Sequence, residues 1–222
     1  MLKNKKILII SPHPDDEAMD SGGLIMRAKK EGAEVFVFYV SVGGSRQFQN
    51  GETKEADRVN EAIEASEYGG FKYKIGFPNT STKLDGMLQK LIIEAIEDIV
   101  KDFKPTIVVI PYQHSYSQDH RAVATACISA FRPIPEDLHP QPKMILEMEE
   151  PTAWPKALNP NFYVDISDVF SEKIKLYLCH KSQVTKDISV RSPENLEALA
   201  RYRGAEIGVK YAEAYNLLKG QL

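Results

Sequence analysis

Residues 5–31 read KKILIISPHPDDEAMDSGGLIMRAKKE, and this stretch indicates the fold class. Its first part, residues 5–11, contains a continuous apolar run, which is typical of a strand buried on both faces of a parallel sheet. A helix is expected from about Asp16 to Glu31, because acidic side chains occupy its first turns, where the helix dipole favours them. Gly32 fits the position just past a helix C-terminus. The stretch therefore predicts the first strand and helix of an α/β protein.

The same alternation of strand and helix continues to residue 131. The expected elements are a strand at 34–41, a helix at 54–68, a short strand near 73–76, a helix at 84–103, a strand at 106–111 and a helix at 118–131. Strands that alternate with helices predict a Rossmann-like α/β fold, with a mostly parallel sheet and helices on both faces. No GxGxxG turn follows the first strand, which disfavours a nucleotide-binding Rossmann protein.

The region of residues 132–160 differs in composition, because it holds seven of the thirteen prolines around one strand-like run at 143–149. We expect an irregular excursion that returns to the sheet, with a domain linker as the alternative. Beyond it, a last strand is expected at 162–166, followed by two helices. These helices are placed at 167–180 and 194–218, the second with Gly204 and Gly208 four residues apart.

The composition is that of an ordinary globular protein, with 222 residues, 43% hydrophobic side chains, 27% charged side chains and a net charge of -3. We expect a single domain over residues 1–222. No Lys/Arg cluster predicts a nucleic-acid partner, and no apolar stretch approaches the ~20 residues that a membrane span requires. Cys127 and Cys179 stand alone, as cysteines do in a reducing compartment, and the N-terminal apolar stretch is too short for a signal peptide. A cytoplasmic location is expected.

Two clusters of histidine and aspartate directly follow expected buried strands. The first, PHPDDE, occupies residues 12–17, and the second, HSYSQDH, occupies residues 114–120. Ligands of open α/β sheets bind at the carboxyl ends of the strands, where the strand order reverses. If the two strands are neighbours across that reversal, both clusters reach one crevice. The alternative, an acidic helix N-terminus with histidines as surface caps, explains one such cluster more readily than two.

The two clusters together contain the ligand set of a catalytic zinc site. Such a site takes three protein ligands of N or O type and leaves one position for water, and His13, Asp16 and His120 supply this set. Asp15 cannot point the same way as Asp16, so it is free to act as a general base. Asp119 is placed to orient a neighbouring imidazole. Zinc is the expected metal, and another divalent ion stays open because His/Asp ligand sets accept several.

The motifs also resemble a known family. The stretch SPHPDDEAMDSGGLIMRAKKEGAEVFVFYVSVGG (residues 11–44) is similar to the opening of the LmbE-like, or PIG-L, family. These are metal-dependent de-N-acetylases that include N-acetylglucosaminyl-phosphatidylinositol deacetylases. The similarity continues in the family's order over nearly the whole chain, through RVNE (58–61), QDHR (118–121), FYVDIS (162–167), HKSQ (180–183) and YAEAY (211–215).

This resemblance implies the same three metal ligands, with Asp15 as the general base. It also implies that water activated by the zinc attacks an amide carbonyl and that acetate and a free amine are released. Arg58 and His180 fall within the family's motifs and are expected to contact the substrate or its surroundings. A plain surface charge is the alternative for Arg58, and a capping role at a helix C-terminus is the alternative for His180.

One position departs from the family's pattern. The second metal motif of the family usually reads HxDH, and its first histidine polarises the carbonyl or stabilises the oxyanion. Ser117 stands at that position here. Loss of one oxyanion donor typically costs about 10²–10³ in rate. His114, three residues earlier, is a candidate to fold back into this place and act in catalysis, and a position on the loop or rim is the alternative.

The resulting prediction is the zinc-dependent hydrolysis of an N-acetyl amide on an N-acetylglucosamine-like sugar or a small amine conjugate. The expected partner is therefore a small N-acetylated molecule. Two other functions stay open. One is a metal hydrolase that cleaves another acyl or carbamoyl bond, and the other is a catalytically weak metal-binding relative. The family also leaves a homo-oligomer open.

Overall fold

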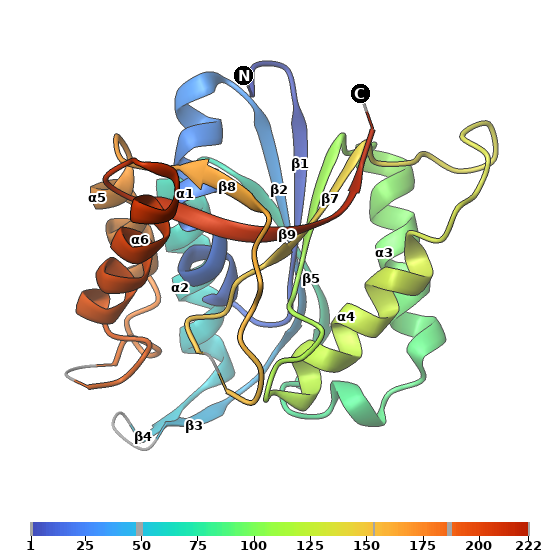
Figure 1. Ribbon diagram of the computed structural model, residues 1–222. Helices are drawn as coiled ribbons and strands as arrows, with labels where there is room; N and C mark the ends of the chain where they lie inside the picture. The colour runs from blue at the N-terminus through green and yellow to red at the C-terminus, as the bar shows by residue number, and fades with distance from the viewer. Residues whose placement is uncertain (1, 48–50, 153, 186–187, 222) are drawn as a thin grey trace.

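The computed structural model describes residues 2–47, 51–152, 154–185 and 188–221 (Figure 1). Its main strands are β1 (Lys6–Ser11), β2 (Glu34–Val42), β5 (Lys72–Pro78), β6 (Ile107–Ile110), β7 (Met144–Met148), β8 (Phe162–Asp165) and β9 (Ala212–Gly220). They form one seven-stranded sheet in the order β5-β2-β1-β6-β7-β9-β8. A separate two-stranded ribbon consists of β3 (Ser45–Gln47) and β4 (Gly51–Thr53).

Helices cover both faces of the sheet (Figure 1). One face carries α1 (Asp16–Glu31), α2 (Glu55–Gly69), α5 (Phe170–Tyr177) and α6 (Pro193–Ile207), and the other carries α3 (Gln89–Phe103) and α4 (Gln118–Ala130). In β1, Ile7 and Ile9 join the core on the first face, while Leu8 and Ile10 join the core on the second. Burial on both faces explains why this strand is an uninterrupted apolar run. The expected Rossmann-like α/β fold is confirmed.

The strand order reverses beside β1. Ile9 of β1 lies opposite Val37 of β2 on one side and opposite Val109 of β6 on the other, and both pairings are parallel. The chain runs outward from β1 through β2 to β5 and then returns to β6 on the opposite side. The ends of β1 and β6 therefore flank the point where open α/β sheets bind ligands. The two strands are neighbours, as the predicted crevice requires.

The proline-rich region returns to the sheet as expected. Its strand β7 pairs in parallel with β6, with Leu146 opposite Val109. The helix expected at 84–103 is divided into a 3-10 turn, η1 (Leu84–Gly86), and α3, which begins at Gln89. The helix expected at 167–180 is the shorter α5. In the part of the chain that the structure describes, no helix has the length and apolar character needed to cross a bilayer.

The C-terminal helix expected at 194–218 is wrong beyond residue 207. The helix α6 is terminated by Gly208, which adopts a left-handed conformation with a φ of 75°. A Cβ on Gly204 would lie 2.7 Å from the Val209 carbonyl oxygen, so the chain crosses back over α6 at this glycine. The residues that follow form β9, which is antiparallel to both β7 and β8. The strand at 162–166 is therefore not the last one.

The strand β9 also holds α1 in place. The helix α1 is kinked at Ser21, where φ is -138°. Just after the kink, the N–H groups of Gly23 and Leu24 donate to the Glu213 carboxylate of β9 at 2.7 and 2.8 Å. The Lys173 ammonium group donates to the same carboxylate at 2.6 Å. This buried contact fixes the helix that begins at the PHPDDE turn.

Candidate metal centre and active site

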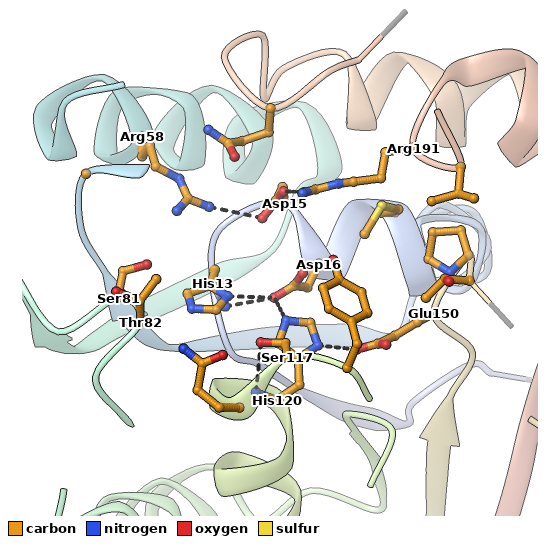
Figure 2. Close-up of a pocket in the computed structure, with 18 residues that line it drawn as sticks. His13, Asp15, Asp16, Arg58, Ser81, Thr82, Ser117, His120, Glu150 and Arg191 are labelled. Atoms are coloured by element: carbon orange, nitrogen blue, oxygen red, sulfur yellow. Dashed lines mark hydrogen bonds and ion pairs between the residues drawn. The ribbon is translucent and has the colours of Figure 1, made fainter. Parts of the chain in front are cut away.

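A cleft of about 540 Å³ opens at the carboxyl edge of the sheet (Figure 2). The turn after β1 contributes His13, Asp15 and Asp16, and the segment after β6 contributes residues 116–118 and His120. Other parts of the chain supply Arg58 from α2, Glu150 after β7 and Arg191 before α6. The two clusters singled out in the sequence thus meet in one place.

Three side chains in this cleft present their ligand atoms to one another. Among the described residues, His13, Asp16 and His120 form the one group of potential metal ligands whose atoms all lie within 4.8 Å of each other. Asp16 Oδ2 lies 3.5 Å from His13 Nδ1 and 3.3 Å from His120 Nε2. The His13 backbone N–H also donates to Asp16 Oδ2 at 2.9 Å, which closes the turn. Two imidazole nitrogens and one carboxylate oxygen are a donor set typical of catalytic zinc.

A carboxylate lies behind each of the two imidazoles. His13 Nε2 is 2.8 Å from Asp119 Oδ2, and His120 Nδ1 is bonded to Glu150. Asp119 is itself fixed, because two backbone N–H groups of residues 82–84 donate to it at 2.6 and 3.0 Å. Carboxylates in these positions set the tautomer and orientation of metal-ligating histidines. The residues present therefore fit a divalent metal.

The charges around the site favour a bound cation. Burial alone would lower the pKa of His13 and of His120, but the carboxylates around them raise both pKa values, that of His120 well above its ordinary value. Burial alone would raise the pKa of Asp16, but the His120 and His13 imidazoles hold that pKa well below its usual range. An excess of buried carboxylate oxygens attracts a positive charge, whether a proton or a metal ion.

Asp15 lies beside the three ligands in an unusual backbone conformation. Its φ of 122° is one that L-residues rarely adopt and costs about 1–3 kcal/mol. The Arg58 guanidinium lies 3.1 Å from Asp15 Oδ1, and the Arg191 guanidinium is bonded to Oδ2. The Asp15 N–H donates to Glu17 Oε2 at 3.0 Å. Figure 2 shows Asp15 between the two arginines, so it is not the unpaired carboxylate that the sequence suggested.

Arg58 and His180 are the two residues expected to contact substrate. Arg58 lines the cleft, but it is buried and donates to the Pro14 carbonyl oxygen at 2.7 Å as well as to Asp15. It therefore holds the turn that carries Asp15. His180 has no exposed surface, and its Nε2 lies 2.7 Å from Glu17 Oε1. A direct contact between His180 and a substrate does not fit this burial.

Ser117, which stands where the HxDH motif of the family has its first histidine, caps a helix. Ser117 is the N-cap of α4, and its hydroxyl oxygen accepts from the His120 N–H at 3.4 Å. His114 does not fold back toward this position. It is exposed, lies outside the cleft lining, and packs edge-on against Tyr112 with the ring centroids 5.6 Å apart. This placement agrees with the loop alternative for His114 and gives no support to the expected catalytic role.

Glu150 and Arg191 line the cleft and contact predicted site residues, but no sequence motif marks them. Glu150 follows β7 by two residues, and the available signal was a carboxylate just after a strand that rejoins the sheet. Arg191 lies 176 residues from Asp15 and has no local pattern that marks it. Contacts of this kind depend on how distant elements pack, which a local sequence pattern does not contain.

Asp20, one turn into α1, is a third residue that the sequence left unnoticed. It is buried, and neither of its carboxylate oxygens has a hydrogen-bond partner among the described residues. Burial raises the pKa of Asp20 well above its ordinary value, and the nearby Asp16 and Glu150 carboxylates add to this effect. A neutral, protonated carboxyl is the form that such an environment favours.

Comparison with known proteins places these features in a family. Residues 8–131 match the family model PIG-L, described as GlcNAc-PI de-N-acetylase. This segment holds all three candidate metal ligands, Asp15, most of β1 and all of β6. The match therefore covers the part of the chain that builds the centre of the site.

Similar proteins extend the match to most of the chain. The diacetylchitobiose deacetylase of Thermococcus kodakarensis is 27% identical over 97% of this chain and 84% of its own length. A probable N-acetyl-alpha-D-glucosaminyl L-malate deacetylase 2 of Bacillus cereus is 27% identical over 81% of this chain and 84% of its own length. The structure of the N,N'-diacetylchitobiose deacetylase from Pyrococcus horikoshii with the inhibitor MPG superposes with a TM-score of 0.75 at 25% identity, covering 97% of this chain and 84% of that one.

Proposed function

The chain belongs to the PIG-L family of de-N-acetylases, and from this premise we propose that it hydrolyses the N-acetyl amide of an N-acetylglucosamine-like sugar that is part of a larger molecule. The observation that carries the proposal is the cluster of His13, Asp16 and His120 with Asp15 beside it in an open cleft. The similar deacetylases support the sugar, since diacetylchitobiose and N-acetyl-glucosaminyl malate, after which two of them are named, both contain an N-acetylglucosamine unit.

The metal in this proposal is zinc, held by His13, Asp16 and His120. Asp119 and Glu150 keep the two imidazoles oriented from behind. A divalent ion at these ligands supplies Lewis acidity, which polarises an amide carbonyl and makes water more acidic. This contribution matters here because Ser117, which caps α4, stands where the family usually has an electrophilic histidine.

Asp15 is the general base of the proposed reaction. Its carboxylate takes a proton from the attacking water, whose oxygen forms a bond to the carbonyl carbon. The C–N bond then breaks, acetate leaves, and the amine nitrogen takes up the proton. Arg58 and Arg191 hold the carboxylate at its two oxygens, so its orientation is set before substrate arrives.

A second cavity supports a substrate that is larger than a single sugar. This cavity has a volume of about 480 Å³ and shares Glu150, Pro151, Thr152 and Val190 with the catalytic cleft. The two cavities are therefore adjacent, and in this proposal a molecule bound at the metal centre extends past these shared residues into the second cavity. We name this cavity the side cavity.

The lining of the side cavity favours an apolar group. Ile188 and Tyr202, two of its residues, are 95% and 60% exposed. Its charged residues are paired, Arg203 with Glu149 at 2.9 Å between Nε and Oε2 and Glu150 with His120. Exposed apolar surface beside a catalytic cleft is typical of a substrate-binding region. We therefore include an apolar substituent on the sugar in the proposed substrate class.

The function is tested by measuring acetate release from N-acetylglucosamine and from its alkyl and aryl glycosides, with and without a chelator. We expect chelator-sensitive release, restored by zinc, and no comparable turnover of an acyl-ester panel. Preferential cleavage of the esters would favour the alternative metal hydrolase. Stoichiometric metal without acetate release from any N-acetylated sugar would identify a metal-binding relative and overturn the proposal.

The side cavity is tested with the substitution Tyr202→Ser. We expect the wild-type protein to favour an aryl glycoside over the free sugar by about tenfold in kcat/KM, the gain from removing roughly 60 Å² of apolar surface from water. Tyr202→Ser should lose most of that preference through KM, while turnover of the free sugar stays unchanged. Leu138→Ser is the matched control, because Leu138 is 74% exposed and lies outside both cavities. Equal preference in both variants would contradict this use of the side cavity.

A further inference from the structure

The side chain and the backbone of Asp15 are held by residues from distant parts of the chain. Its carboxylate contacts Arg191, which lies just before α6, and its N–H donates to Glu17 Oε2 at 3.0 Å. The second oxygen of Glu17, Oε1, lies 2.7 Å from His180 Nε2. Two contacts therefore lead from Asp15 to the C-terminal third of the protein, one through the carboxylate and one through the backbone amide.

The Glu17–His180 pair is buried completely. Neither side chain has exposed surface, and the two residues are 163 positions apart in the sequence. Burial alone would lower the pKa of His180, but the Glu17 carboxylate raises it overall, which favours a cation–carboxylate pair. Such a pair is costly to bury unless its atoms are hydrogen-bonded. His180 Nδ1 has no hydrogen-bond partner among the described residues, so Glu17 is the side-chain partner of this ring. Glu17 uses one oxygen for His180 and the other for the Asp15 amide, so the pair fixes the backbone on which the base stands.

The end of α5 organises both contacts. The His180 N–H donates to the Tyr177 carbonyl oxygen at 3.0 Å, and the Tyr177 hydroxyl donates to the Arg191 carbonyl oxygen at 2.8 Å. Tyr177 is itself fully buried. His180 and Arg191 are therefore set relative to each other by one residue, and both reach Asp15 from the same part of the fold.

We propose that His180 and Arg191 are positioning residues for Asp15, His180 acting through Glu17 on the Asp15 backbone and Arg191 acting on its carboxylate. The proposal rests on the proposed function, in which Asp15 is the base. Its physical reason is the φ of 122° at Asp15, a conformation that persists only where surrounding contacts impose it. Release of either contact lets the carboxylate move from its productive position, and a displacement of about 1 Å is enough to cost about 10²-fold in rate.

The test is a pair of double-mutant cycles in the zinc-loaded protein. His180→Leu and Arg191→Gln are each measured in the wild-type background and in the Asp15→Asn background. In the wild-type background we expect kcat to fall by about 10²-fold, with KM within about threefold and with zinc content unchanged. In the Asp15→Asn background we expect no further loss, because the residue through which both act has been disabled. His180→Gln, whose amide can replace the imidazole Nε2–H, should recover much of the loss.

Matched controls are His139→Leu and Arg201→Gln, since both side chains lie outside the cleft and Arg201 is on the exposed surface of α6.

Equal losses in both Asp15 backgrounds, or no loss in either, would overturn the proposal. If turnover of Asp15→Asn is too small to measure, crystal structures of Arg191→Gln and His180→Leu decide, and an Asp15 carboxylate in its original place in both would contradict the inference. A wild-type protein without acetate release would instead refute the proposed function.

Discussion

The side chains of His13 and Asp119 are 106 residues apart in the sequence, yet His13 Nε2 lies 2.8 Å from Asp119 Oδ2. The contact exists because β1 and β6 are neighbours and the two residues follow the ends of these strands. It also turns the other ring nitrogen of His13, Nδ1, toward Asp16. The contact with Asp119 thereby orients the imidazole of His13, which is one ligand of the candidate metal centre.

Asp119→Asn should weaken metal binding without unfolding the protein. The amide keeps an oxygen for one of the two backbone N–H donors, which bind different oxygens of Asp119. It also loses the charge behind His13, and loss of such a carboxylate typically costs about 10–100-fold in metal affinity. Competition with a chromophoric chelator measures the affinity. Asp137→Asn, at an exposed position, is the control. An unchanged affinity in Asp119→Asn would show that the carboxylate does not orient the imidazole.

Asp15→Asn should separate metal binding from turnover. Asparagine tolerates a positive φ and has the same shape, but it cannot take a proton from water, and a general base typically contributes about 10²–10⁴-fold. We expect kcat to fall within that range while one metal ion per chain is retained. His13→Ala is the contrasting variant, because it should lose the metal itself. Retained turnover in Asp15→Asn would remove this residue from the role of base.

Ser117→Ala should affect stability more than catalysis. The Ser117 hydroxyl caps α4 by accepting from the His120 N–H, and loss of an N-cap costs about 1 kcal/mol of the free energy of unfolding. Ser192→Ala, at the equivalent cap of α6, should cost a similar amount. Denaturant titration measures both. If turnover instead decreased by about a hundredfold or more while stability stayed the same, the Ser117 hydroxyl would be a catalytic group.

Asp20→Asn should make the metal-free protein more stable at neutral pH. The pKa of Asp20 is raised in the folded state by burial and by Asp16 and Glu150, from about 3.9 in the unfolded chain. Folding therefore takes up a proton between these two pKa values, and the free energy of unfolding falls by about 1.4 kcal/mol per pH unit as the pH rises through that window.

The amide of the Asp20→Asn variant cannot ionise, so the decline should be absent and the two proteins should converge at low pH. Denaturant titrations from acidic to neutral pH in the presence of a chelator measure the difference. Asp98→Asn is the control at an exposed position. Parallel pH profiles for Asp20→Asn and the wild-type protein would show that Asp20 ionises in the same way in the folded and unfolded states.

The sequence alone was sufficient to predict the alternation of strands and helices up to residue 131. It was also sufficient to predict that the two His/Asp clusters meet at the ends of β1 and β6. These features have local causes. A strand buried on both faces must be apolar throughout, and the carboxyl ends of parallel strands share one edge of the sheet. Local patterns misled at the C-terminus, where they predict that the helix continues through residues 212–218. The pairing of β9 between β7 and β8 overrides that pattern.

The residues that surround the metal ligands became known from the folded structure. Glu150 behind His120, Arg191 on Asp15 and His180 behind Glu17 are contacts between residues that are 30, 176 and 163 positions apart. These contacts could not be predicted from the sequence, because each depends on helix packing and loop direction, which no short motif encodes. The sequence thus determined where the chemistry sits, since strand ends place it there. The folded chain determined which side chains hold that chemistry in position, because buried charges need partners and the packing selects them.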